Sequence, residues 1–132
     1  MEKLKSILNA RESPVMGIYL KLLAFVLLGF AGLHFANLLG YGDVSLEKML
    51  PAARLAHILY AQFFAITAVG LWKLTSWGVA CFLMGAISQI ILYWGVPEYF
   101  TQVIEGQQAF QGIINIHISL LAIFCLIRIK GK

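Results

Sequence analysis

Residues 14–39 read PVMGIYLKLLAFVLLGFAGLHFANLL, a nearly continuous apolar run interrupted by one lysine, Lys21. A bilayer core about 30 Å thick requires about 20 helical residues to cross it. Within that core every backbone N–H and C=O must be paired inside the protein, and an α-helix achieves this alone. The run therefore predicts a membrane-spanning helix, with Ser13 as its cap and Pro14 in its first turn.

Three further apolar runs follow, so the sequence predicts spans at about residues 14–39, 51–74, 77–95 and 107–128. Of the 132 residues, 61% are hydrophobic and 12% are charged, against about 25% charged residues in soluble domains. Too little polar chain remains for a separate soluble domain, so we interpret residues 1–132 as a single integral membrane domain. The short connections favour an all-α, four-transmembrane-helix antiparallel bundle.

Two segments outside the spans are predicted to form short interfacial helices that lie on the bilayer. In residues 1–11, Leu4, Ile7 and Leu8 share one helical side and the lysines lie elsewhere. Residues 97–106, PEYFTQVIEG, place apolar and polar side chains at helical spacing. Residues 44–50 are predicted to form a polar loop with at most one helical turn.

The basic residues predict how the chain is oriented. Most of them lie near the two termini or in the turn after the second span: Lys3, Lys5, Arg11, Lys73, Arg128, Lys130 and Lys132. Because cytoplasmic loops of membrane proteins are enriched in Lys and Arg, we expect both termini on the cytoplasmic side. The net charge of +4 then suits anionic lipid headgroups. No basic stripe lies on a polar helix face, so we expect no nucleic-acid partner.

Each predicted span gathers small or polar residues on one side. These stripes comprise Gly29, Gly32, Ala36 and Gly40; Ala53, His57, Ala61, Ala65 and Ala68; Gly78, Cys81, Gly85, Ser88 and Gln89; and Gln108, Gln111, Gly112, Asn115, Ser119 and Ala122. Membrane helices associate through small residues and interhelical hydrogen bonds, so we expect the stripes to form the bundle interior. In the alternative, Gln89, Gln111 and Asn115 line a polar cavity or pathway.

The histidines His34, His57 and His117 all fall in the outer half or the middle of predicted spans. Facing histidines at similar depth can ligate haem b, so these three are the candidate haem ligands. Histidines that are hydrogen-bonded in the core or at an interface are the simpler interpretation, and we expect no cofactor and no metal site. His117 lies opposite the polar stripe of its span, which indicates either a central position for this helix or contact with a partner subunit.

No arrangement of a nucleophile with a base appears in any span, so we expect no enzymatic activity. The function predicted is that of an accessory or scaffold subunit in a larger membrane complex, with other membrane subunits or a second copy as partner and the lipid bilayer as surroundings. The alternatives are a small transporter or channel that uses the polar faces of the third and fourth spans, and a b-haem electron carrier.

The motifs Gly70-Leu71-Trp72, Trp77-Gly78 and Gly95-Val96-Pro97-Glu98-Tyr99-Phe100 resemble those of small four-helix inner-membrane proteins of alphaproteobacteria, classed as a domain of unknown function. The similarity runs from the first span to the connection between the third and fourth. It implies a location in a bacterial inner (plasma) membrane and no assigned activity or site. The chain also resembles the four-helix DoxX-like proteins, but it has no motif that identifies it as one of them.

Overall fold

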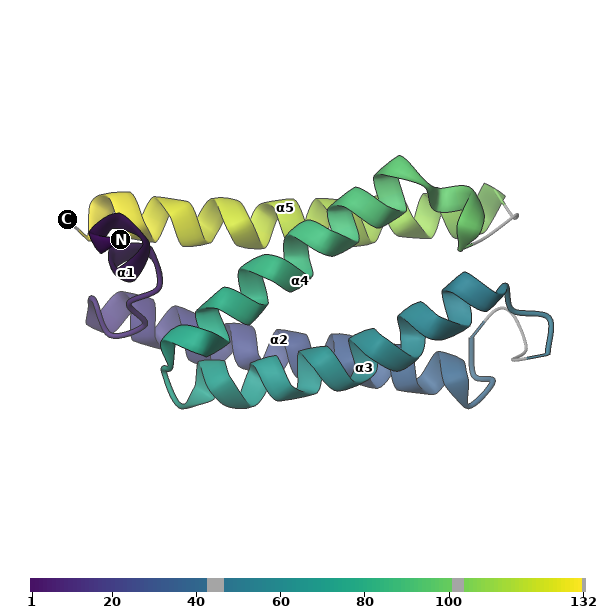
Figure 1. The fold of residues 1–132 in the computed structure, drawn as a ribbon, viewed down its shortest axis with the longest axis horizontal. Coiled ribbons are helices and arrows are strands. Elements are labelled where there is room, and N and C mark those ends of the chain that lie inside the picture. Colours follow the sequence, from purple (N-terminus) through teal and green to yellow (C-terminus); the bar gives the residue numbers. More distant parts are fainter. Residues whose placement is uncertain (43–46, 101–103, 132) are drawn as a thin grey trace.

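The computed structural model describes residues 1–42, 47–100 and 104–131, and describes no side chains for residues 104–107 (Figure 1). Along the chain, the helices are α1 (Glu2–Ile7), α2 (Pro14–Leu38), α3 (Pro51–Trp72), α4 (Ser76–Gly95), the 3₁₀-helix η1 (Pro97–Tyr99) and α5 (Ile104–Lys130). Four of these helices, α2 to α5, are long and apolar enough to cross a membrane. The predicted all-helical, four-span fold is therefore confirmed, and it suggests a multi-pass membrane protein.

The helix boundaries follow from local capping. The Ser13 side chain accepts a hydrogen bond from the backbone N–H of Met16 at 3.1 Å, and Pro14 occupies the first turn of α2. In the turn between α3 and α4, the Thr75 hydroxyl donates to the Gly70 carbonyl at 2.9 Å and accepts from the Gly78 N–H at 3.2 Å. One side chain therefore ends α3 and begins α4.

The segments between the spans agree only in part with the prediction. A helix is present near the N-terminus as α1, and it is shorter than residues 1–11. In place of one surface helix over residues 97–106, the chain forms η1, and α5 already begins at Ile104. Residues 101–103 of that predicted helix, and residues 43–46 around the predicted polar loop, lie outside the described residues.

The four spans run alternately up and down, and both termini lie at the same end of the bundle (Figure 1). Helix α2 packs along α3, whereas α2 and α5 touch only sparsely. Helix α4 crosses obliquely, because it begins against the end of α3 and finishes against α5 (Figure 1). As a result, α3 and α4 are close at their shared turn and diverge toward the opposite end.

Two glycines set the closest approach between α3 and α4. A Cβ built on Gly78 would lie 2.4 Å from the Gly70 carbonyl carbon, and one built on Gly70 would lie 2.5 Å from the Trp77 ring. Backbone contact of this kind gives van der Waals attraction, which drives helix association in lipid where no hydrophobic driving force exists. The pair therefore fixes the closed end of this hairpin.

Large apolar side chains fill the core along the inward faces of the spans. The fully buried ones are Met16, Leu20, Leu23, Leu27, Phe64, Leu71, Val79 and Phe82. The predicted inward stripes of α3 and α4 agree with this core, since their members are buried or half-buried.

The other two predicted inward stripes are wrong. On α2, Gly29 and Gly32 face outward, and a Cβ at either would meet nothing within 4 Å. On α5, the whole stripe from Gln108 to Ala122 is exposed. The physical reason is that α2 and α5 present their large side chains to the core, His34 and His117 among them, so Gly29 and Gly32 of α2 and the amide stripe of α5 take the opposite side.

Candidate functional site

One hydrogen-bonded network joins all four spans, and each span contributes one side chain. The Nδ1 atoms of His34 on α2 and His57 on α3 lie 2.8 Å apart. The other His34 nitrogen, Nε2, lies 3.1 Å from Nε2 of Gln89 on α4. The Gln89 oxygen Oε1 in turn bonds Nε2 of His117 on α5. Gln89 therefore lies at the centre of the network, with a histidine on each amide atom.

Aromatic rings enclose this network. His34, Gln89 and His117 are buried, Gln89 and His117 completely, whereas His57 is half-buried. Phe30 stacks on the His117 ring at a centroid distance of 5.1 Å, and Tyr60 stacks on His34 at 5.5 Å. In these surroundings, an imidazole or amide group without a hydrogen-bond partner would be costly, and the bonds of the network supply partners to all four side chains.

The donors of the network can be assigned from its connectivity if all three histidines are neutral. The Gln89 amide N–H donates to His34 Nε2, so His34 carries its proton on Nδ1 and donates to His57. His117 donates from Nε2 to the Gln89 oxygen, which leaves its Nδ1 as a bare acceptor. That atom is buried and has no hydrogen-bond partner within residues 1–42, 47–100 and 108–131. With the Gln89 amide reversed, His117 Nδ1 would be an N–H without a partner, and a stranded donor is rarer in proteins than a stranded acceptor.

The same geometry gives the haem hypothesis no support. Metal–nitrogen bonds to histidine are about 2.0–2.1 Å long, so two nitrogens 2.8 Å apart bond each other and cannot lie on opposite sides of one metal ion. His117 uses its Nε2 for Gln89 and turns its ring against Phe30. Among the residues that the structure describes, no group of three or more His, Cys, Asp or Glu could hold a metal.

Of the two positions considered for His117, in the bundle core or against a partner subunit, the structure shows the core. The His117 side chain points into the core toward Gln89, so it does not face a partner subunit. This placement also turns the opposite side of α5, with Gln111, Asn115 and Ser119, outward.

The outward polar stripe of α5 is defined by Gln111, Asn115 and Ser119. Among the described residues, its side chains form hydrogen bonds only within their own helix. The Gln111 amide N–H donates to Asn115 Oδ1 at 3.0 Å, and the Ser119 hydroxyl donates to the Asn115 carbonyl at 2.8 Å. Gln89 lies on the other side of α5, in the core. The predicted pathway that joins Gln89 to Gln111 and Asn115 is therefore not formed.

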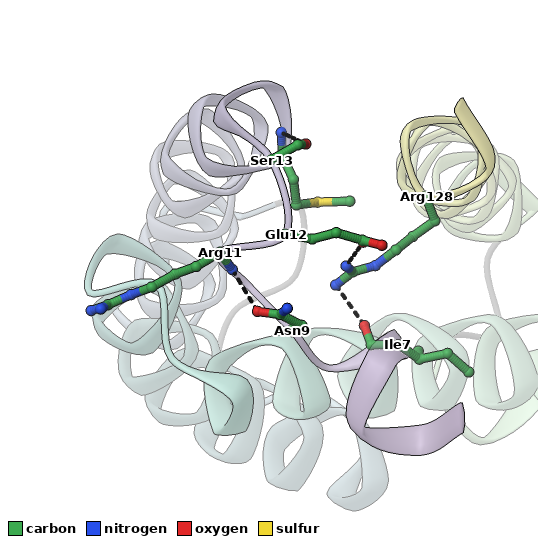
Figure 2. Close-up of polar contacts among 7 residues, drawn as sticks. Ile7, Asn9, Arg11, Glu12, Ser13 and Arg128 are labelled. Atoms are coloured by element: carbon green, nitrogen blue, oxygen red, sulfur yellow. Dashed lines mark hydrogen bonds and ion pairs between the residues drawn. The ribbon is translucent and has the colours of Figure 1, made fainter. Parts of the chain in front are cut away.

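A buried charge near the chain termini was not anticipated from the sequence. Arg128, in the last turn of α5, forms an ion pair with Glu12, and its Nη2 donates to the Ile7 carbonyl of α1 at 2.6 Å (Figure 2). Its guanidinium also lies 5.1 Å from the centre of the Phe124 ring. These contacts tie α1 and the connection before α2 to α5. The sequence shows Arg128 only as one of several basic residues near the C-terminus.

An apolar groove opens where α3 and α4 diverge. Its volume is about 500 Å³, and its lining includes Leu59, Phe63, Met84 and Phe100. The polar part of its wall is the pair Tyr60 and Ser88, whose hydroxyl oxygens lie 2.8 Å apart. The Ser88 hydroxyl donates to the Gly85 carbonyl, so it accepts from Tyr60.

Comparisons with known proteins establish a family and no activity. No curated protein and no solved structure gives a significant match. A family model described as a family of unknown function (DUF6163) matches residues 14–131, which include all four spans. The chain therefore belongs to the family of unknown function DUF6163.

Proposed function

We propose that this protein is a non-enzymatic accessory subunit of a larger membrane assembly and that it docks through the outward polar stripe of α5. The observation that carries the proposal is the exposure of Gln111, Asn115 and Ser119 on the side of the helix that faces away from the bundle. Asn115 lies seven residues inside the span that begins at Gln108, about 10 Å along the helix axis. At that depth the surroundings are hydrocarbon and not water.

The stripe keeps hydrogen-bonding capacity that a neighbouring helix could use. Gln111 and Asn115 share one hydrogen bond, which leaves the Asn115 amide N–H groups and the Gln111 oxygen without a partner among the described residues. Lipid tails offer neither donors nor acceptors, and amide hydrogen bonds between membrane helices are worth about 0.6–2 kcal/mol each. A partner helix would satisfy these atoms.

Small residues beside the amides support close approach of that helix. A Cβ at Gly112 would meet nothing within 4 Å, and Ala122 continues the exposed face. Small residues on one helix face let two helix backbones come together, so that side-chain amides reach across. The partner in this proposal is a transmembrane helix, supplied by another subunit or by a second copy of the chain.

The proposed setting is a bacterial inner membrane with both termini in the cytoplasm. Support comes from the location of α1, Arg11 and the end of α5 at one end of the bundle, together with Lys73 in the α3–α4 turn. Reporter fusions at the two termini test this orientation. Alkaline phosphatase should be inactive, and green fluorescent protein fluorescent, at both ends. Opposite results at the two termini would contradict it.

The docking proposal is tested by gentle affinity purification of the full chain in mild detergent, followed by mass spectrometry. We expect a stoichiometric partner, or a second copy, that is lost from the double variant Gln111→Leu/Asn115→Leu. The control variant Ile116→Ala/Ile123→Ala alters exposed residues of the same helix outside the stripe, and it should keep the partner. Equal recovery with both variants, or no partner in any preparation, would overturn the proposal.

Cross-linking gives an independent measure of the same contact. Asn115→Cys, in a chain with Cys81→Ser and Cys125→Ser, should form a cross-link in native membranes with a thiol-reactive reagent. The equivalent change at Ile116 should form less. A cross-linked product of twice the chain mass would identify the partner as a second copy.

A further inference from the structure

A cavity with basic walls lies where α2 begins, between the connection from α1 and the turn from α3 to α4. Its volume is about 390 Å³, and its lining includes Arg11, Lys21, Ile18 and Leu74. One water occupies about 30 Å³ in the liquid, so the space would hold a polar group far larger than a water molecule. This cavity lies at the other end of the bundle from the histidine network and away from the polar stripe of α5.

The position of the Lys21 ammonium group is fixed by an aromatic contact. Its Nζ lies 5.3 Å from the centre of the Trp72 ring, a cation–π contact. The Trp72 ring is itself held by the edge of Phe25 at 5.4 Å. Because Trp72 is the last residue of α3, Lys21 is directed back toward the membrane surface.

The charge of the cavity is positive because its acidic residue is already paired. Glu12 contributes to the wall of the cavity, but its carboxylate forms an ion pair with Arg128 of α5 (Figure 2). Arg11 extends away from that ion pair, and its backbone N–H bonds the Asn9 side chain at 3.1 Å (Figure 2). Two cations therefore border the cavity with no free carboxylate among its lining residues.

An apolar track leads from the cavity into the membrane along the outer face of α2. Ile18, Leu22 and Phe25 are each at least 60% exposed. Their spacing of four and three residues places them on one side of the helix, close to Lys21. A basic cavity continuous with an exposed apolar track matches a molecule that has an anionic head and a hydrocarbon tail.

We propose that this cavity binds an anionic phospholipid, with its phosphate between Arg11 and Lys21 and one acyl chain along Ile18, Leu22 and Phe25. Both features are needed for this choice. A soluble phosphate compound would use the two cations and leave the track unused, whereas a neutral lipid would use the track and leave the cations unmatched. Arg11 lies just before the first span, and the Lys21 side chain, although it starts seven residues inside that span, reaches back to Trp72 at the end of α3, so both cations lie near the depth of a lipid phosphate.

The test is native mass spectrometry of the full chain, delipidated in detergent and mixed with equal amounts of phosphatidylglycerol and phosphatidylcholine. We expect a phosphatidylglycerol adduct that is weakened about thirtyfold in Arg11→Gln/Lys21→Gln, because each cation near an anionic lipid contributes about 1 kcal/mol. Lys21→Arg should retain the adduct. The control Lys3→Gln/Lys5→Gln removes the same charge from the exposed α1 and should change the adduct little.

Three results would overturn the proposal. Equal loss of the adduct in both double variants would indicate diffuse attraction to the basic end of the bundle. Equal binding of both lipids would remove the role of the cations. Displacement of the lipid by millimolar glycerol phosphate would assign the cavity to a soluble phosphate compound. Thermal unfolding of each variant, monitored by circular dichroism, shows whether a lost adduct reflects a lost fold.

Discussion

The inward and outward faces of the bundle carry similar polar and small residues but satisfy them differently. In the core, Gln89 has both amide atoms bonded to histidines of other helices, and Gly78 touches the backbone of α3. On the outer face, the hydrogen bonds that Asn115 forms with described residues stay within α5, and Gly32 has open space around it. Among the described residues, the inner face makes its hydrogen bonds between helices of one chain, with only His117 Nδ1 left over in the network, whereas the outer face still has room and hydrogen-bonding capacity for a neighbour.

The largest difference between the two faces is expected at the glycines. Gly78→Ala would place a methyl group within 2.4 Å of the backbone of α3, so the α3–α4 hairpin must open. We expect a loss of about 1–3 kcal/mol in the free energy of unfolding. Gly32→Ala meets nothing and should be neutral or slightly stabilising, because alanine is the better helix former. Unfolding of both variants in detergent, monitored by circular dichroism, provides the measurement, and equal stabilities would contradict the close contact.

The polar network gives the next largest effect. Gln89→Leu removes two hydrogen bonds and leaves a nitrogen on each of His34 and His117 unpaired, at a cost of about 2 kcal/mol. The double variant Gln89→Leu/His117→Leu should lose less than the sum of the two single variants, since the residues share one bond. Unfolding free energies of the three variants test this coupling. Additive losses would mean that the network does not act as one unit.

The ion pair at the membrane surface should contribute less. Glu12→Gln keeps a hydrogen-bonding group beside Arg128 but removes the opposite charge, so we expect a loss of about 1 kcal/mol in stability. The loss should change little at high salt, because the Arg128 and Glu12 side chains are only 9% and 18% exposed and are shielded from mobile ions. Glu2→Gln on the exposed α1 is the control and should have no effect. A loss that disappears at high salt would contradict a pair shielded from solvent.

The smallest effect on the isolated chain is expected at the outer face. Asn115→Leu breaks one exposed hydrogen bond within α5 and introduces a side chain that suits lipid, so the unfolding midpoint in detergent should be unchanged or slightly higher. If the midpoint falls as far as that of Gln89→Leu, then the stripe supports the fold, and the contrast between the two faces is lost.

The spans and several caps could be predicted from the sequence, because a long apolar run and a Ser-Pro start have local causes. Which side of α2 and of α5 faces the core could not be predicted from the sequence. The sequence shows that Gln111 and His117 lie on different sides of one helix, but not which side meets α4. Packing of the large side chains decided this, and it placed His117 inside. The pairing of Glu12 with Arg128 was equally out of reach, because 116 residues separate them.

Because Gly70 and Gly78 hold α3 and α4 together at the turn, any change in the angle between these helices pivots at that contact. Helix α4 has 20 residues and is therefore about 30 Å long. Over that length, a tilt of α4 by about 5° at the glycine contact moves the far end of the helix by roughly 2.5 Å. The groove bounded by Tyr60 and Ser88 lies between α3 and α4. The width of the groove therefore depends on the angle between α3 and α4 at a glycine contact several turns away. A ligand that separated the two helices would also move Gln89, which belongs to α4.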